Sequence, residues 1–172
     1  MSEMVWQGRY LSVRTEGHWE YAERTGAIAA VVIVAVTPAG ELLLVEQHRV
    51  PAGRICVELP AGLVGDDSDG ESVSDAAIRE LEEETGYRAG AIEEHGDFYS
   101  SPGMTSERFT FVVARDLTRT GDGGGEESED ITVHRVPLGE VRAFVAARRR
   151  EGRGIDAKLL LVLGGELLPG VG

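Results

Sequence analysis

Three glutamates of one predicted helix have the types and spacing to bind a divalent metal ion. Residues 79–87 read Arg-Glu-Leu-Glu-Glu-Glu-Thr-Gly-Tyr, and at about 100° per residue Glu80 and Glu84 share a helix face, with Glu83 beside them. Like charges at this spacing repel one another, and only Arg79 supplies a cation within the turn. A hard cation bound by carboxylate oxygens would relieve the repulsion, and Mg²⁺ suits this ligand set. The alternative is an ordinary charged helix face in contact with water.

The charge of the chain argues against partners that need a basic surface. The 172 residues include 17 lysines and arginines and 30 acids, which give a net charge of −13. Nucleic-acid phosphates and anionic lipids both favour basic proteins, so neither is an expected partner. Residues 66–84 hold nine acids and residues 126–130 hold four, and Arg79 is the only cation in these two segments. The acidity is therefore concentrated in two places.

The glutamates need a helix with defined ends. Ser72 is a typical N-cap with Asp75 three residues later, and Gly86 suits the left-handed conformation that often ends a helix. Ala77 and Leu81 are four residues apart and indicate the buried side. We therefore expect a helix between residues 72 and 86.

The strongest strand signals precede this helix. Residues 27–36 are apolar throughout, and residues 42–45 are apolar again after a Thr-Pro-Ala-Gly turn. We expect these segments to form a hairpin at the centre of a sheet covered on both faces. Weaker signals predict an earlier hairpin from 10–13 and 19–22, further strands at 57–59, 109–114 and 131–136, and helices at 141–150 and 156–163.

These elements predict an α+β domain with helices packed on a mixed sheet. The length suits a single domain over residues 1–172, and no internal repeat or long linker divides it. Residues 121–125 are rich in glycine and read as a flexible loop, and Cys56, the only cysteine, reads as a small core residue. No segment resembles a signal peptide or a membrane span, so the expected location is the cytoplasm.

The spacing around the glutamates resembles the Nudix box. Gly65 is followed after five residues by Glu71, and after seven more by the run from Arg79 to Tyr87, which matches the motif at every fixed position. The chain is thus similar to the Nudix hydrolases, which cleave nucleoside diphosphates linked to another group. The resemblance implies an α/β/α sandwich with a mixed β-sheet, in which the box forms a loop-helix-loop catalytic motif.

The resemblance also implies roles within the box. Glu71 would pair with Arg79 and hold the loop against the helix, while Gly65 and Gly86 would be structural glycines. Glu83 would count among the catalytic residues as well as the metal ligands. The metal, Mg²⁺ or Mn²⁺ in its place, would be bound by Glu80, Glu83 and Glu84.

The glycine that opens the box has two readings. In the resembling enzymes a Pro-Ala-Gly triplet opens it, but here that triplet ends at Gly62, three residues before Gly65. Either Gly65 takes that place by sequence only, or the loop 65–70 carries a three-residue insertion. We expect the insertion, with the backbone carbonyl of Ala61 offered to a metal and Asp66, Asp67 and Asp69 on a solvated bulge.

Three features outside the box resemble the ADP-ribose pyrophosphatase branch of the family. The lead-in Glu58-Leu59-Pro60-Ala61-Gly62 is characteristic of it, and Pro102 falls 16 residues after Gly86. The acidic stretch before Ile131, followed by Gly154-Ile155-Asp156-Ala157, is similar to its C-terminal part. The resemblance implies Mg²⁺-dependent cleavage of ADP-ribose, or a similar nucleotide sugar, into AMP and a sugar phosphate.

Hydrolysis also needs a base that activates water, placed on an element that closes over the substrate. Glu127 follows the glycines of 121–125 and matches the catalytic glutamate of the resembling enzymes. Glu129 is the second candidate and Glu126 the third. The alternative is that the whole acidic run is a solvated loop.

Substrate binding has its own candidates. Arginine forms a planar fork that fits phosphate, and Arg49 matches a substrate-binding arginine of the resembling enzymes; Arg54 is a further candidate, and a plain surface role is the alternative for Arg49. Trp19 and Tyr21 could stack on adenine, and Glu58 could accept a hydrogen bond from it. A core or dimer-interface role for either aromatic is equally consistent with the sequence.

The resemblance further implies a homodimer in which an N-terminal region, residues 1–25, is exchanged between subunits. Two other functions stay open. The substrate could be another nucleotide sugar such as GDP-mannose, or the domain could sense a ligand without catalysis. The second fits less well, because the glutamates of the box are intact.

Overall fold

The computed structural model describes the chain except residues 28, 66–69, 126–128 and 168–172. The strands are β1 (Glu3–Gln7), β2 (Leu11–Glu16), β3 (Trp19–Arg24), β4 (Ala30–Ala35), β5 (Glu41–Arg49), β6 (Arg54–Glu58), β7 (Ala61–Leu63), β8 (Tyr87–Arg88), β9 (Ala91–Tyr99), β10 (Arg108–Arg115), β11 (Thr118–Arg119), β12 (Thr132–Pro137) and β13 (Gly154–Ile155). The α-helices are α1 (Val73–Thr85), α2 (Val141–Arg150) and α3 (Leu160–Leu167). Short 3₁₀ turns are η1 (Thr25–Ala27), η2 (Val50–Ala52), η3 (Leu138–Glu140) and η4 (Ala157–Leu159).

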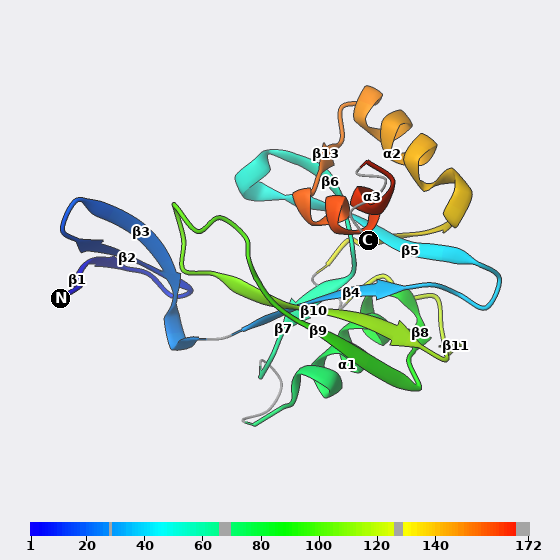
Figure 1. Ribbon diagram of the computed structural model, residues 1–172, viewed down its shortest axis with the longest axis horizontal. Helices are drawn as coiled ribbons and strands as arrows, with labels where there is room; N and C mark the ends of the chain where they lie inside the picture. The colour runs from blue at the N-terminus through cyan, green and yellow to red at the C-terminus, as the bar shows by residue number, and fades with distance from the viewer. Residues whose placement is uncertain (28, 66–69, 126–128, 168–172) are drawn as a thin grey trace.

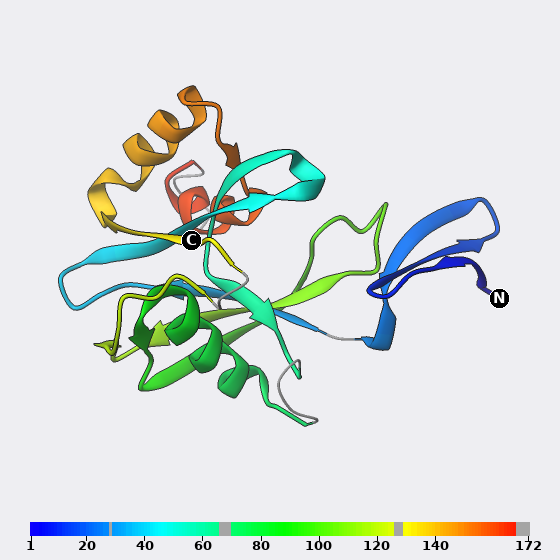
Figure 2. The same cartoon turned by 180° about the vertical axis from the view of Figure 1, so that it is seen from behind.

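Two four-stranded sheets form the body of the molecule (Figure 1). One has the order β7-β4-β10-β9 and the other β12-β5-β6-β13. Each is mixed, because β10 runs parallel to β4 and β13 runs parallel to β6, while the remaining pairs are antiparallel. α1 covers the first sheet, and α2 and α3 lie on the side of the second (Figures 1 and 2). The predicted α+β class and its layered sandwich are confirmed.

The central strands are apolar on both faces because helices cover both sides. In β4, Val31 and Ile33 enter a core cluster with Leu81 of α1, while Val32 enters a second cluster that includes Leu159 of η4. These side chains are at most 1% exposed. The expectation that residues 27–36 lie in a sheet covered on both faces is therefore confirmed.

The expected pairing of residues 27–36 with 42–45 as one hairpin is wrong. β4 and β5 follow one another around the turn at 37–40, where Gly40 has a φ of +78°. Within the described residues no strand pairing joins β4 to β5; an isolated bridge links Val36, which follows β4, to Leu42, and each strand pairs with partners in its own sheet. Because residues 30–35 and 42–45 are all apolar, their pattern predicts a central position without specifying the neighbouring strand.

β1, β2 and β3 form a separate antiparallel sheet that projects from the body (Figures 1 and 2). The pairing of β2 with β3 confirms the predicted early hairpin; β1 lacks a sequence signal because all five of its residues are exposed. The sheet is tied to the loop 100–107: the Ala22 amide donates to the Met104 carbonyl, and the Ser106 amide donates to the Ala22 carbonyl, both at 3.0 Å. Its large exposed apolar side chains include Met4, Val5, Trp6, Tyr10, Leu11 and Trp19.

The other predicted segments match elements of the structure, whereas the short strands β7, β8, β11 and β13 and one long strand were not predicted. Residues 57–59, 109–114, 131–136 and 141–150 fall within or overlap β6, β10, β12 and α2, and Asp156 caps η4 ahead of α3, as expected. The long edge strand β9 was missed, because eight of its nine residues are exposed and its pattern carries no apolar run. No helix in the described part of the chain is long and apolar enough to span a bilayer.

Candidate active site

Helix α1 presents its glutamates as the spacing predicts. Ser72 caps it by accepting a hydrogen bond from the Asp75 amide at 3.1 Å, and Gly86 ends it with a φ of +73°. Leu81 is fully buried in the core beneath the helix. Glu80 and Glu84 emerge on a face that meets β7, so the strand before the box lies directly against the carboxylates.

β7 approaches the helix so closely that a side chain at one of its positions would displace a carboxylate of α1. The Ala61 amide donates to Glu84 Oε2 at 3.1 Å, and the Leu63 amide donates to Glu80 Oε1 at 3.2 Å. A Cβ atom at Gly62, between these two residues, would lie 1.8 Å from Cδ of Glu80. The close-approach glycine is therefore Gly62.

We expect Gly62→Ala to displace the Glu80 carboxylate and to lower turnover by about 10- to 100-fold. Mutations of groups that orient metal ligands typically lower activity by this factor. Gly139→Ala is the matched control, because a Cβ atom there meets nothing within 4 Å. Steady-state kinetics of both variants at saturating metal check this expectation. Equal activity of the two variants would contradict it.

Gly65 has a different role, in an ion-pair network centred on Arg79. Its amide donates to Glu71 Oε2 at 2.9 Å, and Arg79 Nε donates to Glu71 Oε1 at 2.9 Å. Arg79 also donates to the Leu63 carbonyl, and its Nη1 lies 2.9 Å from Glu80 and 3.2 Å from Glu83. The Arg79 guanidinium and the Gly65 amide hold the pKa of Glu71 below its usual range. The expected pairing of Glu71 with Arg79 is present, and it fastens the loop to the helix.

The glycine run 121–125 is anchored on the end of α1 instead of being loose. The amides of Gly124 and Gly125 donate to the carbonyls of Glu84 and Glu83, at 2.9 and 3.0 Å. A Cβ atom at Gly123 would lie 2.4 Å from the Thr85 carbonyl carbon, so this position requires glycine because its backbone packs directly against the backbone at the end of α1. The contact brings the chain that leads into the second acidic segment directly onto the glutamate helix.

The two inner glutamates are unfavourably placed as anions. Glu84 is 5% exposed, and burial raises its pKa to about 8, with further rises from Glu80 and Glu129. Burial also raises the pKa of Glu80, although Arg79 acts in the opposite direction. A carboxylate removed from water without a neutralising cation is costly. This donor set therefore fits a divalent cation.

The carboxylates do not yet converge as a ligand cage. Among the described residues, no three acidic, histidine or cysteine side chains surround one point as metal ligands would. Glu80 and Glu83 both turn towards Arg79, and Glu83 lines a separate outer hollow with Glu71 and Arg79. Of the expected metal ligands, Ala61, Glu80 and Glu84 line the main cavity.

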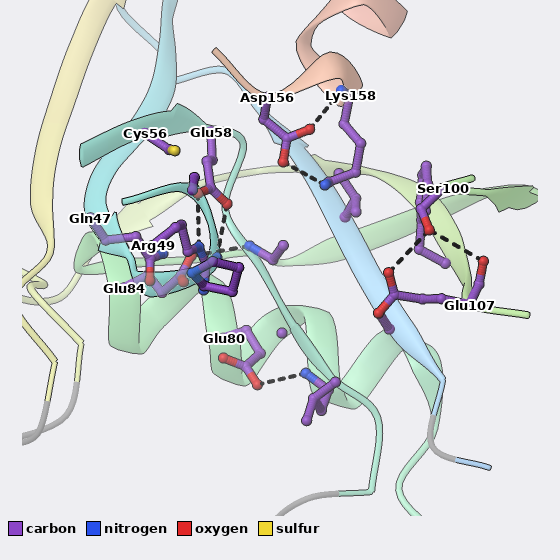
Figure 3. A pocket seen from close by; sticks show the side chains of 18 of the residues that line it. Gln47, Arg49, Cys56, Glu58, Glu80, Glu84, Ser100, Glu107, Asp156 and Lys158 are labelled. Carbon is purple, nitrogen blue, oxygen red and sulfur yellow. Dashed lines mark hydrogen bonds and ion pairs between the residues drawn. The ribbon is translucent and has the colours of Figure 1, made fainter. Parts of the chain in front are cut away.

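That cavity has a volume of about 740 Å³. Residues of both four-stranded sheets line it, and Figure 3 shows their side chains. Its cations are each paired with a carboxylate of the same cavity: Arg24 with Glu107, Arg49 with Glu58, and Lys158 with Asp156. The described lining contains six carboxylates in all and these three cations, so negative charge predominates. The acidic lining residues are Glu58, Glu80, Glu84, Glu107, Glu129 and Asp156.

Some of the candidate substrate-binding residues line the cavity and others lie outside it. Arg49 and Glu58 line the cavity and bind one another through two hydrogen bonds of 2.8 Å. Arg54 does not line it, and Trp19 lies in another hollow, with Tyr21 and Pro102 beside the loop 100–107. Glu129 lines the cavity, whereas Glu126 and Glu127 are outside the described residues, as are Asp66, Asp67 and Asp69.

Several cavity residues carried no usable sequence signal. Arg24 is the last residue of β3 and Glu107 directly precedes β10, so the two are far apart in the chain, and Ser100 donates to Glu107 at 3.1 Å. Lys158 donates to Asp156, which was placed from the sequence only at the start of a helix. For residues 154–157, the resemblance to a branch of a known family was the one sequence signal that this segment belongs to the site.

Comparisons with known proteins agree with the geometry. A sequence model of the NUDIX domain matches residues 26–158. An uncharacterised Nudix hydrolase of Schizosaccharomyces pombe is 32% identical over 171 residues, covering 92% of this chain and 80% of the relative. An ADP-ribose pyrophosphatase of Bacillus subtilis is 37% identical, covering 69% of this chain and 63% of the relative. A GDP-mannose pyrophosphatase of Pectobacterium atrosepticum is 34% identical, covering 78% and 69%.

The fold also matches a solved structure. The crystal structure of an ADP compounds hydrolase superposes with a TM-score of 0.72, covering 97% of this chain and 91% of that chain at 24% identity. At this level of identity the match establishes the shared fold.

Proposed function

The chain belongs to the Nudix family of pyrophosphatases, and from that premise we propose that it hydrolyses the diphosphate of ADP-ribose or of a closely related nucleoside diphosphate sugar, with Mg²⁺ as the metal. The products would be AMP and a sugar phosphate. The observation that carries the proposal is the pair of buried carboxylates, Glu80 and Glu84, at the wall of a cavity of about 740 Å³. A cavity of this volume is in the range that binds small ligands.

A divalent cation would complete this site. It would be held by Glu80, Glu83, Glu84 and the backbone carbonyl of Ala61, and when bound it would screen the phosphates, polarise phosphorus and lower the pKa of water. The chain's own residues supply orientation and proton transfer. Arg49, fixed in direction by Glu58, is placed to bind phosphate oxygens with its planar fork.

The second acidic segment supplies the base in this proposal. The hydrogen bonds of the preceding Gly124 and Gly125 to the end of α1 support that role, as does the presence of Glu129 in the cavity wall. We expect Glu127→Gln to lower kcat by about 100-fold or more, the usual contribution of a general base. Glu129→Gln, tested in parallel over pH 6–9, is the second candidate. Full activity of the Glu127 variant would contradict the assignment and leave Glu129 as the base.

Substrate choice is open between two nucleotide sugars, because relatives named for ADP-ribose and for GDP-mannose both match the chain. We favour ADP-ribose, on the resemblance of the segments outside the box. A panel of ADP-ribose, ADP-glucose, GDP-mannose and UDP-glucose, with the nucleoside monophosphate measured as product, decides between them. A higher kcat/KM for GDP-mannose than for ADP-ribose would contradict this choice.

We propose that the enzyme works as a homodimer through residues 1–25. The exposed apolar side chains of the β1–β3 sheet support this, since a projecting sheet with Trp6 and Trp19 in water is a typical association surface. Trp19 and Tyr21, which share a hollow with Pro102, would stack on the nucleobase. Cys56 is a free buried thiol, as is usual in reducing compartments, which supports a cytoplasmic location.

A further inference from the structure

Glu46 is a buried carboxylate outside the site described above. It lies on β5 and is 6% exposed, and its side chain faces α2, whereas the neighbouring Gln47 lines the cavity. Glu46 Oε1 lies 3.0 Å from Arg148 Nε, and Oε2 lies 3.4 Å from Arg153 Nε. His134 Nε2 is 3.5 Å from Oε1. One carboxylate therefore contacts α2, the turn after it and β12.

The cluster around Glu46 is not needed to fill the protein interior. A buried ion pair often stabilises a protein no more than apolar residues of similar volume would. Arg148 is further constrained, since it lies 4.9 Å above the Phe144 ring and pairs with Glu151 at 2.8 Å. Burial lowers the pKa of His134, so the cations that face Glu46 at neutral pH are the two arginines. The arrangement instead fixes how the surrounding elements are oriented relative to one another, because each partner of Glu46 comes from a different element.

The backbone at Glu46 connects these elements to the cavity. In the second sheet one row of paired residues runs Thr132, Glu46, Val57, Ile155 across all four strands. The amide of Asp156, next to the end of that row, donates to the Val57 carbonyl at 3.0 Å. Arg153 immediately precedes β13, so its contact with Glu46 holds the approach to Asp156 and Lys158. Those two residues line the cavity together with Arg49 and Glu58 (Figure 3).

We propose that Glu46 is a positioning residue for substrate binding, which holds β13 against the sheet through Arg153 and Arg148 and so fixes the Asp156–Lys158 wall of the cavity. The reaction it serves is the one proposed above, and in that respect the inference rests on the proposed function. Glu46 does not line the cavity, so its effect passes through the neighbouring wall.

The test compares Glu46→Gln with Glu151→Gln. Both remove one negative charge and one contact of Arg148, but Glu151 is half exposed and lies outside the paired row. Amide hydrogen exchange should become faster at residues 153–158 in the Glu46 variant alone, with α1 unchanged in both. With ADP-ribose, the Glu46 variant should raise KM about tenfold and change kcat by less than about threefold, because misplacement of a binding wall acts on binding. If this variant does not fold, Arg153→Gln replaces it, with the same expectations.

A double-mutant cycle shows whether the effect passes through the wall. In a Lys158→Ala background, Glu46→Gln should cause no further rise in KM; additive effects would overturn the proposed route. Unchanged exchange at residues 153–158 would overturn the proposal outright, as would a loss confined to kcat and melting temperature. If the wild-type protein turned over no nucleotide sugar, the proposed function would fail, while the exchange experiment would still decide the structural role of Glu46.

Discussion

Glu84→Gln is expected to reduce kcat by at least about 100-fold while the fold is retained. The carboxylate of Glu84 is buried at the cavity wall, and the Ala61 amide is its described hydrogen-bond partner. A glutamine carbonyl can accept the same hydrogen bond but has no charge with which to bind a cation. Steady-state kinetics with ADP-ribose and Mg²⁺, together with the melting temperature, measure the two effects separately. Glu83→Gln is expected to lower kcat by a comparable factor, although Glu83 lies 3.2 Å from Arg79.

Glu82→Gln is the matched control for this prediction. Glu82 belongs to the same turn of α1 but pairs with Arg88 on the outer surface, at 2.6 Å, and does not line the cavity. The control should keep kcat within about threefold of the wild type, since an exposed ion pair contributes little. If Glu84→Gln were as active as Glu82→Gln, the metal-binding role of Glu84 would be wrong.

The metal-free protein should lose stability as the pH rises from about 4.5 to about 8. Burial raises the pKa of Glu84 to about 8, so the folded protein keeps a proton that the unfolded chain releases near its ordinary value of 4.5. The contribution of Glu84 is therefore fully present below pH 4.5 and is lost as the pH rises through the folded pKa. Because a tenfold change in proton affinity is worth about 1.4 kcal/mol, the loss amounts to up to roughly 5 kcal/mol.

Bound Mg²⁺ should reverse this dependence, since a cation beside Glu84 favours the ionised carboxylate. Denaturant unfolding at pH 5, 6, 7 and 8, in EDTA and in excess Mg²⁺, measures the effect. The Glu84→Gln variant should show a much flatter profile in EDTA and a smaller gain from Mg²⁺. The same slope in the variant as in the wild type would assign the pH dependence to other groups.

The local part of the site was predictable from the sequence because it depends on short-range rules. The caps of α1 at Ser72 and Gly86, the buried side of the helix at Leu81 and the pairing of Glu71 with Arg79 follow from spacing within fifteen residues. The apolar strand 27–36 likewise predicted a core position covered on both faces, which is where β4 lies. In each case a neighbour in the chain decides the structure.

The parts that depend on distant neighbours could not be predicted in this way. Nothing in residues 27–45 indicates that β4 and β5 enter different sheets, since residues 30–35 and 42–45 are equally apolar. The pairing of Arg49 with Glu58 was not predicted either, although each residue was a separate candidate for substrate binding. The glycines of 121–125 were predicted to form a flexible loop, but Gly123 packs closely on the end of α1 and the amides of Gly124 and Gly125 donate to its carbonyls, contacts that depend on a helix much earlier in the chain.

The central claim is that this chain cleaves the diphosphate of a nucleotide sugar at the Glu80–Glu84 wall. The most direct measurement is the release of AMP from ADP-ribose by the purified full chain at pH 7–9, with Mg²⁺ and separately with Mn²⁺, with Glu84→Gln run beside it. We expect AMP and ribose phosphate in equal amounts from the wild type, and at least about 100-fold less from the variant. The absence of AMP across this pH range with both metals would contradict the account.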